Sequence, residues 1–288
     1  MCLSVGGGLL RSLERLFRGC ENEMYQKQLI YGFLSGSRRL LIILDACRYD
    51  ALIENIEILN PIKTKTSKVL SSGSCTKDWL LNTFNKPLDV VYVTANPWVL
   101  LLLKNSNVFK AIDDVSTRFW DEKLGTVRAQ HVNLVALKYL IKGENLVVHY
   151  LQPHPPFVAG TWLEDRSSPP YLAGSKIYDL AARNKNARRE FRRAYIENLR
   201  YVLRYVKRLV QAALRLDYKV VITADHSELL GTYAPLKTLK LMFRKNLVKF
   251  LKNWLPYAVG YYHVVGHPCG WVGRELYEVP WVDVYGEA

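Results

Sequence analysis

The sequence predicts an α/β fold in which helices flank a doubly wound, mainly parallel sheet. Two observations predict it: short apolar, β-branched runs recur along the chain, and helix-like patterns lie between them. Such runs are typical of strands that are covered on both faces, as they are in parallel sheets. A hydrophobic content of 49% and a charged content of 23% are ordinary for a folded globular protein.

Five runs are predicted to be strands. In chain order they are RLLIILD (39–45), DVVYVT (89–94), NLVVHYL (145–151), KVVITA (219–224) and VPWVDV (279–284). In sheets of this class, ligands bind beyond the carboxyl ends of the strands. The polar residues at those ends are Asp45, residues 94–96, residues 150–154, Asp225 and His226. We therefore expect a site along this edge.

A long amphipathic helix is predicted from Arg188 to Leu216. Its apolar residues repeat at spacings of three and four, so at about 100° per residue they form one stripe. The stripe comprises Phe191, Tyr195, Leu199, Val202, Val206, Leu209 and Ala213, and the opposite face carries Arg189, Arg193, Arg200, Arg204, Lys207 and Arg215. We interpret the basic face as a solvated surface rather than a nucleic-acid groove, because no base-stacking aromatic residues are interleaved on it.

The formal charge of +14 favours anionic partners, namely phosphate or sulfate esters, an anionic membrane surface or, less favoured here, nucleic acid. Part of this charge lies in a second amphipathic segment, Leu236 to Leu255, which is bracketed by prolines and rich in lysine. The simplest interpretation is that this basic insert, residues 235–256, packs on the core. A lid or an interfacial membrane helix is the alternative.

The cysteines and the apolar segments bear on the cellular location. The five cysteines form no CxxC pair, so a disulfide framework or a zinc ribbon is not expected and a reducing interior is the default. We expect no signal peptide, and the apolar run at 99–104 is too short to cross a membrane. The sequence thus predicts a cytoplasmic protein, membrane-peripheral at most, with an N-terminal helical extension (1–37) and a single domain (38–288).

Asp45, Asp225 and His226 are predicted to bind a divalent metal ion. The last two residues follow an apolar run, and burying a carboxylate beside an imidazole costs free energy unless both are ligated or hydrogen-bonded. A lone aspartate at a strand end is more often a helix cap. Two carboxylates and an imidazole from two strand ends, however, form a suitable ligand set for a divalent ion.

The stretch SSGSCTKDW (71–79) is the candidate nucleophile segment. Small residues lead into a predicted helix, which places Ser74, Cys75 or Thr76 near a helix N-terminus, where N–H groups and the helix dipole favour an anion. A hydroxyl held there beside a metal ion is acidified and becomes a nucleophile. The alternative is that Thr76 is only the N-cap of the helix.

Histidines occur in two further stretches, HYLQPHPPF (149–157) and YYHVVGHPCGW (261–271). We interpret His149 as a packed core residue. His154 lies in a proline-stiffened loop and is expected to contact an anion or a metal ion. His267 is favoured over His263, because its flanking glycine and proline predict a loop there.

The stretches ILDACRYD, SSGSCTKDW, HYLQPHPPF, ITADHSELLG and GHPCGW followed by YEVPWVDV, in this order, resemble the alkaline phosphatase and sulfatase superfamily. The resemblance is greatest to its compact archaeal sulfatase-like members and covers residues 38–285. It implies that residues 38–288 form a catalytic domain with the three-layer α/β sandwich of that superfamily.

The resemblance also implies roles for individual residues. Asp45 matches the first metal aspartate, Asp225 with His226 matches the metal pair, and one of Ser74, Cys75 and Thr76 matches the nucleophile. His154 corresponds to a contact of the transferred group, and His267 to a late histidine that serves a second metal ion or the anion. Arg48 and Asp50 belong to the first stretch and are expected to support the site.

One departure from the family pattern separates the functional alternatives. A sulfatase of this superfamily needs Cys-x-Pro-x-Arg to make formylglycine, whereas Cys75 is followed by TKDW, so an unmodified hydroxyl is favoured, Thr76 before Ser74. The predicted function is hydrolysis or transfer of phosphate esters with one or two divalent ions (Zn, Mn, Mg or Ca). The alternatives are a sulfatase, a transferase acting on membrane-linked glycans, and a catalytically reduced protein that binds nucleic acid or a membrane surface.

Overall fold

The computed structural model describes residues 24–158, 175–233 and 262–287. Its centre is a seven-stranded sheet of order β2-β11-β8-β1-β7-β3-β4. The strands are β1 (Arg39–Asp45), β2 (Ile62–Leu70), β3 (Leu88–Thr94), β4 (Phe109–Asp114), β7 (Leu146–Pro153), β8 (Lys219–Ala224) and β11 (Glu278–Glu287). Two small sheets pair β9 (Leu229–Thr232) with β10 (Val264–Gly266) and β5 (Trp120–Asp121) with β6 (Thr126–Val127).

The central sheet is mainly parallel, as predicted. Neighbouring strands from β8 through β1, β7 and β3 to β4 run parallel, and β11 is antiparallel to both β8 and β2. All five predicted strands belong to this sheet. The two strands of this sheet that the sequence did not predict, β2 and β4, are its edges, where partly exposed polar residues interrupt the apolar run.

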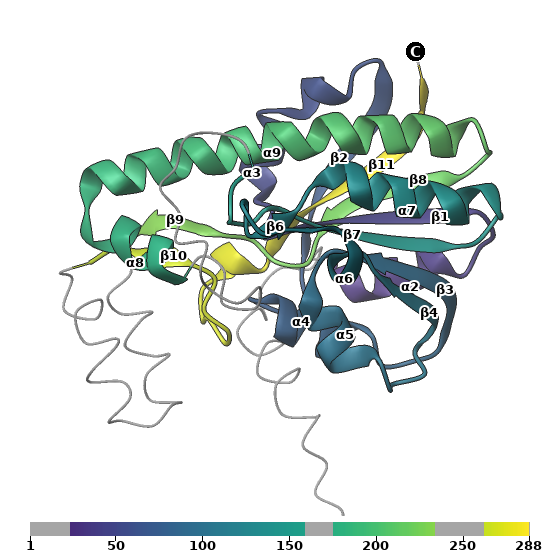
Figure 1. Cartoon of the computed structure of the whole chain (residues 1–288), viewed down its shortest axis with the longest axis horizontal. Helices are drawn as coiled ribbons and strands as arrows, with labels where there is room; N and C mark the ends of the chain where they lie inside the picture. The colour runs from purple at the N-terminus through teal and green to yellow at the C-terminus, as the bar shows by residue number, and fades with distance from the viewer. Residues whose placement is uncertain (1–23, 159–174, 234–261, 288) are drawn as a thin grey trace, which may run out of the picture.

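Helices cover both faces of the sheet, which gives three layers (Figure 1). On one face lie α7 and α9, and on the other lie α2, α4 and α5. The helices are α2 (Gln26–Leu34), α3 (Tyr49–Ile53), α4 (Thr76–Thr83), α5 (Pro97–Leu103), α6 (Ser116–Phe119), α7 (Ala129–Ile141), α8 (Ser175–Arg183) and α9 (Lys185–Leu214), with 3-10 turns η1 (Ile56–Leu59) and η3 (Arg274–Leu276). The fold class predicted from the sequence is therefore confirmed.

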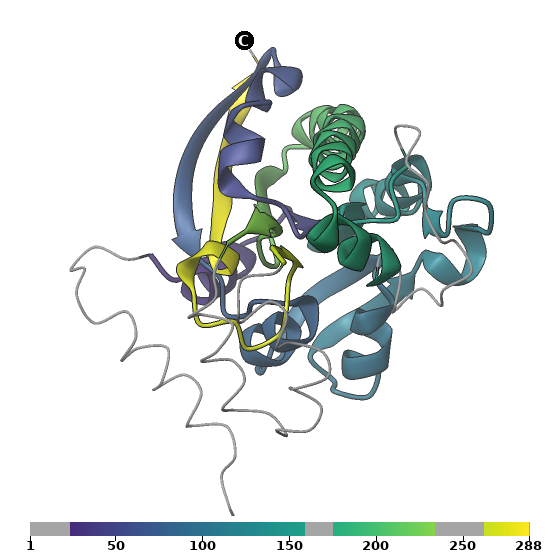
Figure 2. The same ribbon diagram turned by 90° about the vertical axis from the view of Figure 1, so that its left-hand side faces the viewer.

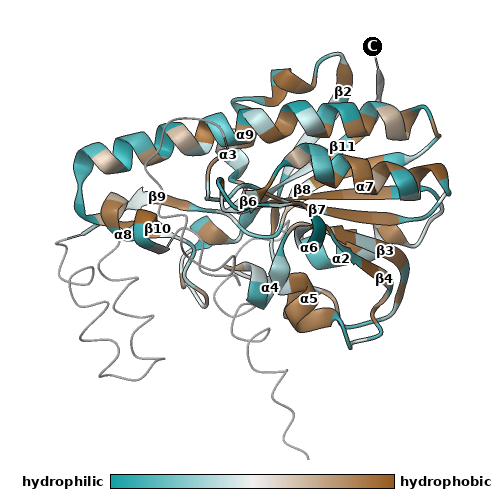
Figure 3. Ribbon diagram, in the orientation of Figure 1, coloured by the Kyte–Doolittle hydropathy of each residue, from teal (hydrophilic) through white to brown (hydrophobic). Residues whose placement is uncertain are grey.

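Helix α9 confirms the predicted amphipathic helix, which Figure 2 shows nearly end-on. It begins at Lys185, where the side chain of Asn184 accepts hydrogen bonds from the N–H groups of Asn186 and Ala187. Every residue of the predicted apolar stripe is buried. The predicted basic residues are exposed, apart from a half-buried Lys207, and Figure 3 shows this hydrophilic outer face.

The described residues include only part of the predicted N-terminal extension and none of the predicted basic insert. Of the N-terminal extension (1–37), the structure describes residues from Met24 onwards, and α2 packs against the sheet through the buried Ile30 and Leu34. The basic insert (235–256) lies outside the described residues. Within the described residues, no helix combines the length and the apolar character that crossing a membrane requires.

Candidate active site

The sheet brings Asp45, Asp225 and His226 together. Strands β1 and β8 are parallel neighbours, so the aspartate that ends β1 lies beside the pair that follows β8. His226 Nε2 lies 3.7 Å from Asp45 Oδ1 and 3.3 Å from Asp225 Oδ2. All three side chains are buried. Their proximity agrees with the predicted metal site, and their role as ligands stays a prediction.

Thr76 is the predicted nucleophile that lies in this cluster. Its Oγ1 donates a hydrogen bond to Asp225 Oδ2 at 2.7 Å and lies 3.2 Å from His226 Nε2. The other oxygen of Asp225 accepts the backbone N–H groups of Ala46 and His226, at 3.0 Å and 2.8 Å. The backbone thereby fixes the carboxylate so that Oδ2 faces the hydroxyl.

The structure does not use Thr76 as the N-cap of α4. Thr76 is the first residue of α4, and the capping position is taken by Cys75, whose side chain makes no capping hydrogen bond among the described residues. The hydroxyl of Thr76 contacts Asp225 and His226 instead. The N-cap alternative is therefore wrong, and the helix start presents this hydroxyl to the cluster.

Ser74 links two loops. Its Oγ donates to the carbonyl of Pro268 at 3.1 Å and accepts the N–H groups of Gly270 and Trp271 at 2.9 Å and 3.2 Å. The hydroxyl of Ser74 is fully buried and makes all three of these hydrogen bonds. Ser74 thus anchors the loop after His267 to the loop before Thr76, and no bond from it to Asp225 or His226 occurs among the described residues.

Ser74→Ala tests this assignment. We expect the free energy of unfolding to fall by about 1 to 3 kcal/mol, because the buried N–H group of Trp271 and the half-buried N–H group of Gly270 lose their acceptor. Turnover should fall much less than in Thr76→Ala, since the contact of Thr76 with Asp225 does not involve Ser74. Denaturant unfolding and turnover are measured on the same samples. Complete loss of turnover with unchanged unfolding would instead make Ser74 the nucleophile.

Cys75 forms a disulfide with Cys269, which corrects two expectations. The cysteines are 194 residues apart in sequence, and the fold brings their Cα atoms to 5.1 Å. A bonded sulfur offers no thiolate, so Cys75 is neither the nucleophile nor a precursor of formylglycine. The absence of a CxxC pair therefore did not exclude a disulfide, because no spacing rule relates cysteines so far apart. The ligand-capable group Cys75, Asp78 and Cys269 loses both thiolates for the same reason.

His154 and His267 lie beside the cluster of Asp45, Asp225 and His226. The ring centroids are 5.0 Å apart, and the ring of His267 lies 4.3 Å from that of His226. Burial lowers the pKa of His154 to about 3 and that of His267 to about 4, so both rings are neutral near pH 7. His263 packs near Tyr233 instead, with 5.8 Å between the ring centroids. The structure thus places the two favoured histidines, but not His263, at the site.

Sequence reasoning missed Glu228. Its buried carboxylate lies 3.2 Å from His267 Nδ1 and accepts a hydrogen bond from the hydroxyl of Tyr178 at 3.0 Å. Burial raises the pKa of Glu228 to about 7. The signal that could have found it is an acidic residue two positions after His226, directly before the apolar LLG stretch.

His149, interpreted from the sequence as a packed core residue, lies beside Asp225. It is fully buried, but its Nε2 lies 3.9 Å from Asp225 Oδ2. Ligand atoms of Asp45, His149 and Asp225 lie within 4.8 Å of one another. A strand pattern indicates that this histidine is buried, but it does not indicate which face of the sheet the side chain occupies.

The cluster fits a divalent ion. Asp45 Oδ1 and His149 Nε2 are buried and have no hydrogen-bond partner among the described residues. Burial and the nearby Asp225 raise the pKa of Asp45 well above its usual value, and no described lysine or arginine forms an ion pair with either carboxylate. A divalent cation would ligate the unpaired atoms and offset the buried negative charge.

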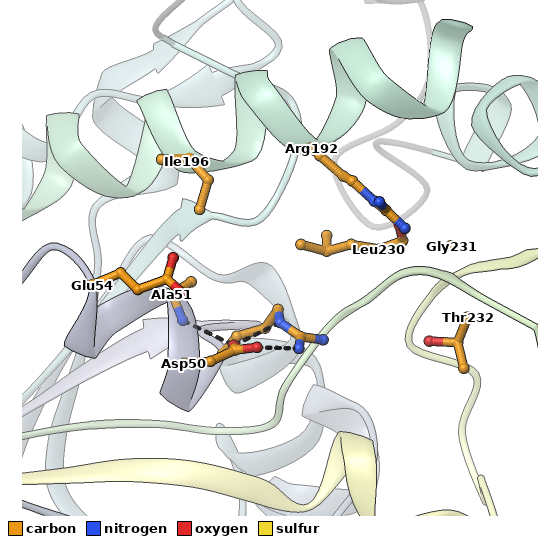
Figure 4. Close-up of a pocket in the computed structure, with 9 residues that line it drawn as sticks. Asp50, Ala51, Glu54, Arg192, Ile196, Leu230, Gly231 and Thr232 are labelled. Atoms are coloured by element: carbon orange, nitrogen blue, oxygen red, sulfur yellow. Dashed lines mark hydrogen bonds and ion pairs between the residues drawn. The ribbon is translucent and has the colours of Figure 1, made fainter. Parts of the chain in front are cut away.

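Arg48 and Asp50 lie outside the cluster of Asp45, Asp225 and His226, and their supporting role stays a prediction. Arg48 donates two hydrogen bonds to Asp50 and one to the carbonyl of Glu228, so it ties the loop after β1 to the loop after β8. A surface pocket lies beside this pair, between α3, α9 and β9 (Figure 4). Thr76, Asp45, Asp225 and His226 do not line this pocket.

The seven-stranded sheet with its flanking helices is the α/β fold of alkaline phosphatase and sulfatase-like proteins. Among solved structures, the chain is similar to the soluble domain of lipooligosaccharide phosphoethanolamine transferase A from Neisseria meningitidis, with a TM-score of 0.50, 14% identity, and coverage of 87% of this chain and 78% of that chain. It is also similar to the C-terminal periplasmic domain of EcEptC from Escherichia coli in complex with Zn, with a TM-score of 0.51, 12% identity, and coverage of 88% and 74%.

The chain spans about half of the whole integral membrane transferase from Neisseria meningitidis, 48% of its length, at a TM-score of 0.50 and 15% identity. No family model matches the sequence, and no curated protein matches it. The likeness at these identities establishes the fold. The predicted closeness to archaeal members stays a prediction, since the similar structures described here come from bacteria.

Proposed function

We propose that this protein is a metal-dependent enzyme that hydrolyses or transfers phosphate esters through the hydroxyl of Thr76. The observation that carries the proposal is the position of this hydroxyl, 2.7 Å from Asp225 Oδ2 and 3.2 Å from His226 Nε2. The same hydroxyl lies at the start of α4, where N–H groups and the helix dipole favour a phosphate.

In the proposed reaction, Thr76 Oγ1 attacks phosphorus while its proton passes to Asp225 Oδ2, the acceptor of its hydrogen bond. The bond from phosphorus to the alcohol breaks as the bond to Thr76 forms, and the alcohol leaves with a proton from solvent. His154 and His267 hold the non-bridging oxygens. A bound divalent ion lowers the pKa of the hydroxyl and neutralises developing charge. Water or a second alcohol then takes the group from Thr76.

The Asp45, Asp225 and His226 side chains would hold the ion, with Thr76 on its open side. We further propose that the substrate is a phosphodiester and that the acceptor is an alcohol. Two similar structures support this choice, because they are phosphoethanolamine transferases. The high positive charge supports a substrate or membrane surface that is anionic.

The sequence predicts a cytoplasmic protein, membrane-peripheral at most, and this location stays a prediction. The observation that weighs against a reducing compartment is the disulfide between Cys75 and Cys269, since such bonds persist mainly in oxidising environments. Alkylation of thiols at the moment of cell lysis tests the location. If Cys75 and Cys269 are both found alkylated, they were free thiols in the cell, which indicates a reducing compartment.

Turnover of three aryl esters tests the function. Zinc- or manganese-loaded protein is assayed with a phosphodiester, a phosphomonoester and a sulfate, and we expect diester turnover that chelation removes. Faster turnover of the sulfate would favour the sulfatase alternative, although Cys75 cannot supply formylglycine while it is bonded to Cys269. Absence of turnover with salt-sensitive binding of DNA or anionic vesicles would favour the binding-protein alternative.

A further inference from the structure

His149 has a fixed orientation within the core. It lies on β7 in register with Ile43 of β1, and its neighbour Tyr150 points to the opposite face, where the hydroxyl donates to Asn133 Oδ1 of α7. His149 therefore points toward the face covered by α4. This is the face that carries Thr76.

Two aromatic rings hold the imidazole in place. The Trp79 and Tyr92 rings lie 5.9 Å and 6.2 Å from that of His149, measured between centroids. Trp79 is itself anchored, because its Nε1 donates to Gln26 Oε1 at 2.8 Å. The imidazole is fully buried and cannot turn away from the cluster without displacing this packing.

The two ring nitrogens of His149 have different surroundings. Nδ1 lies 3.1 Å from the hydroxyl oxygen of Tyr92. Nε2 has no hydrogen-bond partner among the described residues and lies 3.9 Å from Asp225 Oδ2. Donors bound at about 2.0 to 2.2 Å to one ion lie about 3 to 4 Å apart. The spacing of His149 from Asp225 is close to what a shared ion requires.

We propose that His149 is a direct ligand of the divalent ion through Nε2, and that Tyr92 orients the ring by accepting the Nδ1 proton. The proposal rests on the proposed function, which requires the ion, and it adds a residue to which the family resemblance assigns no role. A metal-bound histidine commonly donates its second N–H to such a partner. With His149 and His226, the site has two imidazoles beside two carboxylates, a donor set that suits Zn²⁺ better than Mg²⁺ or Ca²⁺.

The competing arrangement has the other tautomer. In it, Tyr92 donates to Nδ1, and Nε2–H points at the Asp225 carboxylate, so that His149 only positions a ligand. X-ray absorption distinguishes the two, because it counts imidazoles bound to zinc. Protein loaded with one equivalent of zinc should show two imidazoles, and His149→Ala should show one.

Zinc affinity gives a second readout. We expect His149→Ala to weaken zinc binding by about 100-fold or more, and Tyr92→Phe, which removes the orienting hydroxyl, by about 10-fold with two imidazoles retained. His131→Ala is the matched control, since His131 stacks on Phe119 away from the cluster. It should leave both the affinity and the count unchanged.

The outcomes separate this inference from the proposed function. One imidazole in the parent protein, or parent-like affinity in His149→Ala, overturns the role of His149 even if turnover is normal. Two imidazoles without turnover of any ester overturn the proposed function alone, and failure of the parent to bind zinc overturns both. If His149→Ala does not fold, the imidazole count of the parent and the affinity of Tyr92→Phe decide.

Discussion

Thr76→Ala is expected to lose turnover of the phosphodiester by a factor of about 10⁴ or more while it stays folded and keeps its divalent ion. The reason is that the attacking oxygen is removed, whereas Asp45, Asp225 and His226 remain. Among the described residues, no second hydroxyl makes the contacts that Thr76 Oγ1 makes with the Asp225 and His226 side chains. Turnover, metal content after dialysis and thermal unfolding are measured on one preparation.

Two variants control this result. Thr76→Ser keeps the hydroxyl and should retain turnover within about 10-fold of the parent, since only a methyl group is lost. Thr83→Ala makes the same change at the other end of α4, where the residue is buried but away from the cluster, and should leave turnover unchanged. Parent-like turnover in Thr76→Ala, or a phosphorylated Ser74 found by mass spectrometry, would contradict the assignment.

The central strands could be predicted from sequence, because burial on both faces leaves continuous apolar runs. The strand 39–45 and the strand 219–224 have in the structure the bounds that their sequence patterns predicted. The edge strands β2 and β4 could not, since one side of each is partly exposed and carries lysine, threonine or aspartate. An edge strand is stabilised by its neighbour in the sheet, here β11 and β3, and that pairing leaves little trace in the local sequence.

The candidate site shows the same division. Asp45, Thr76, Asp225 and His226 could be proposed because each ends a strand, follows a strand or opens a helix, and the carboxyl ends of parallel strands meet at one edge of the sheet. The position of His149 beside Asp225 could not be predicted, because it depends on which face of β7 the side chain occupies. Contacts between residues far apart in sequence could not be predicted either, because the local sequence does not show which segments the fold brings together.

The links made by Ser74 and Cys75 show why those residues were ambiguous as nucleophiles. The hydroxyl of Ser74 bonds to the loop of residues 268–271, and the sulfur of Cys75 bonds to Cys269 in that loop. Both therefore hold the loop after His267 against the segment that carries Thr76. A hydroxyl or thiol near a helix start is compatible with either role, and only its distant partner distinguishes them.

Asp225→Asn is expected to lose the bound divalent ion and to reduce turnover by about 10³-fold or more. An amide keeps the shape of the side chain and one oxygen for the N–H groups of Ala46 and His226, but it removes the charge of one of the two buried carboxylates. His226→Ala should lose the ion as well. Metal content is measured by emission spectrometry after dialysis, and stoichiometric metal in both variants would refute the assignment.

Stability distinguishes the loss of a ligand from damage to the fold. Burial raises the pKa of Asp225, but His226, His149 and the hydrogen bonds to its carboxylate outweigh burial and lower the pKa overall, so the ion-free Asp225→Asn protein should be less stable than the ion-free parent near pH 7. An ion at 100 times its Kd stabilises the parent by about 2.7 kcal/mol, whereas the variant should gain nothing. Asp179→Asn, an exposed aspartate paired with Arg183, is the matched control and should respond to the ion as the parent does. A variant that the ion still stabilises to the same extent would show that Asp225 is not a ligand, because a ligand that binds only the folded state must raise its stability in proportion to its affinity.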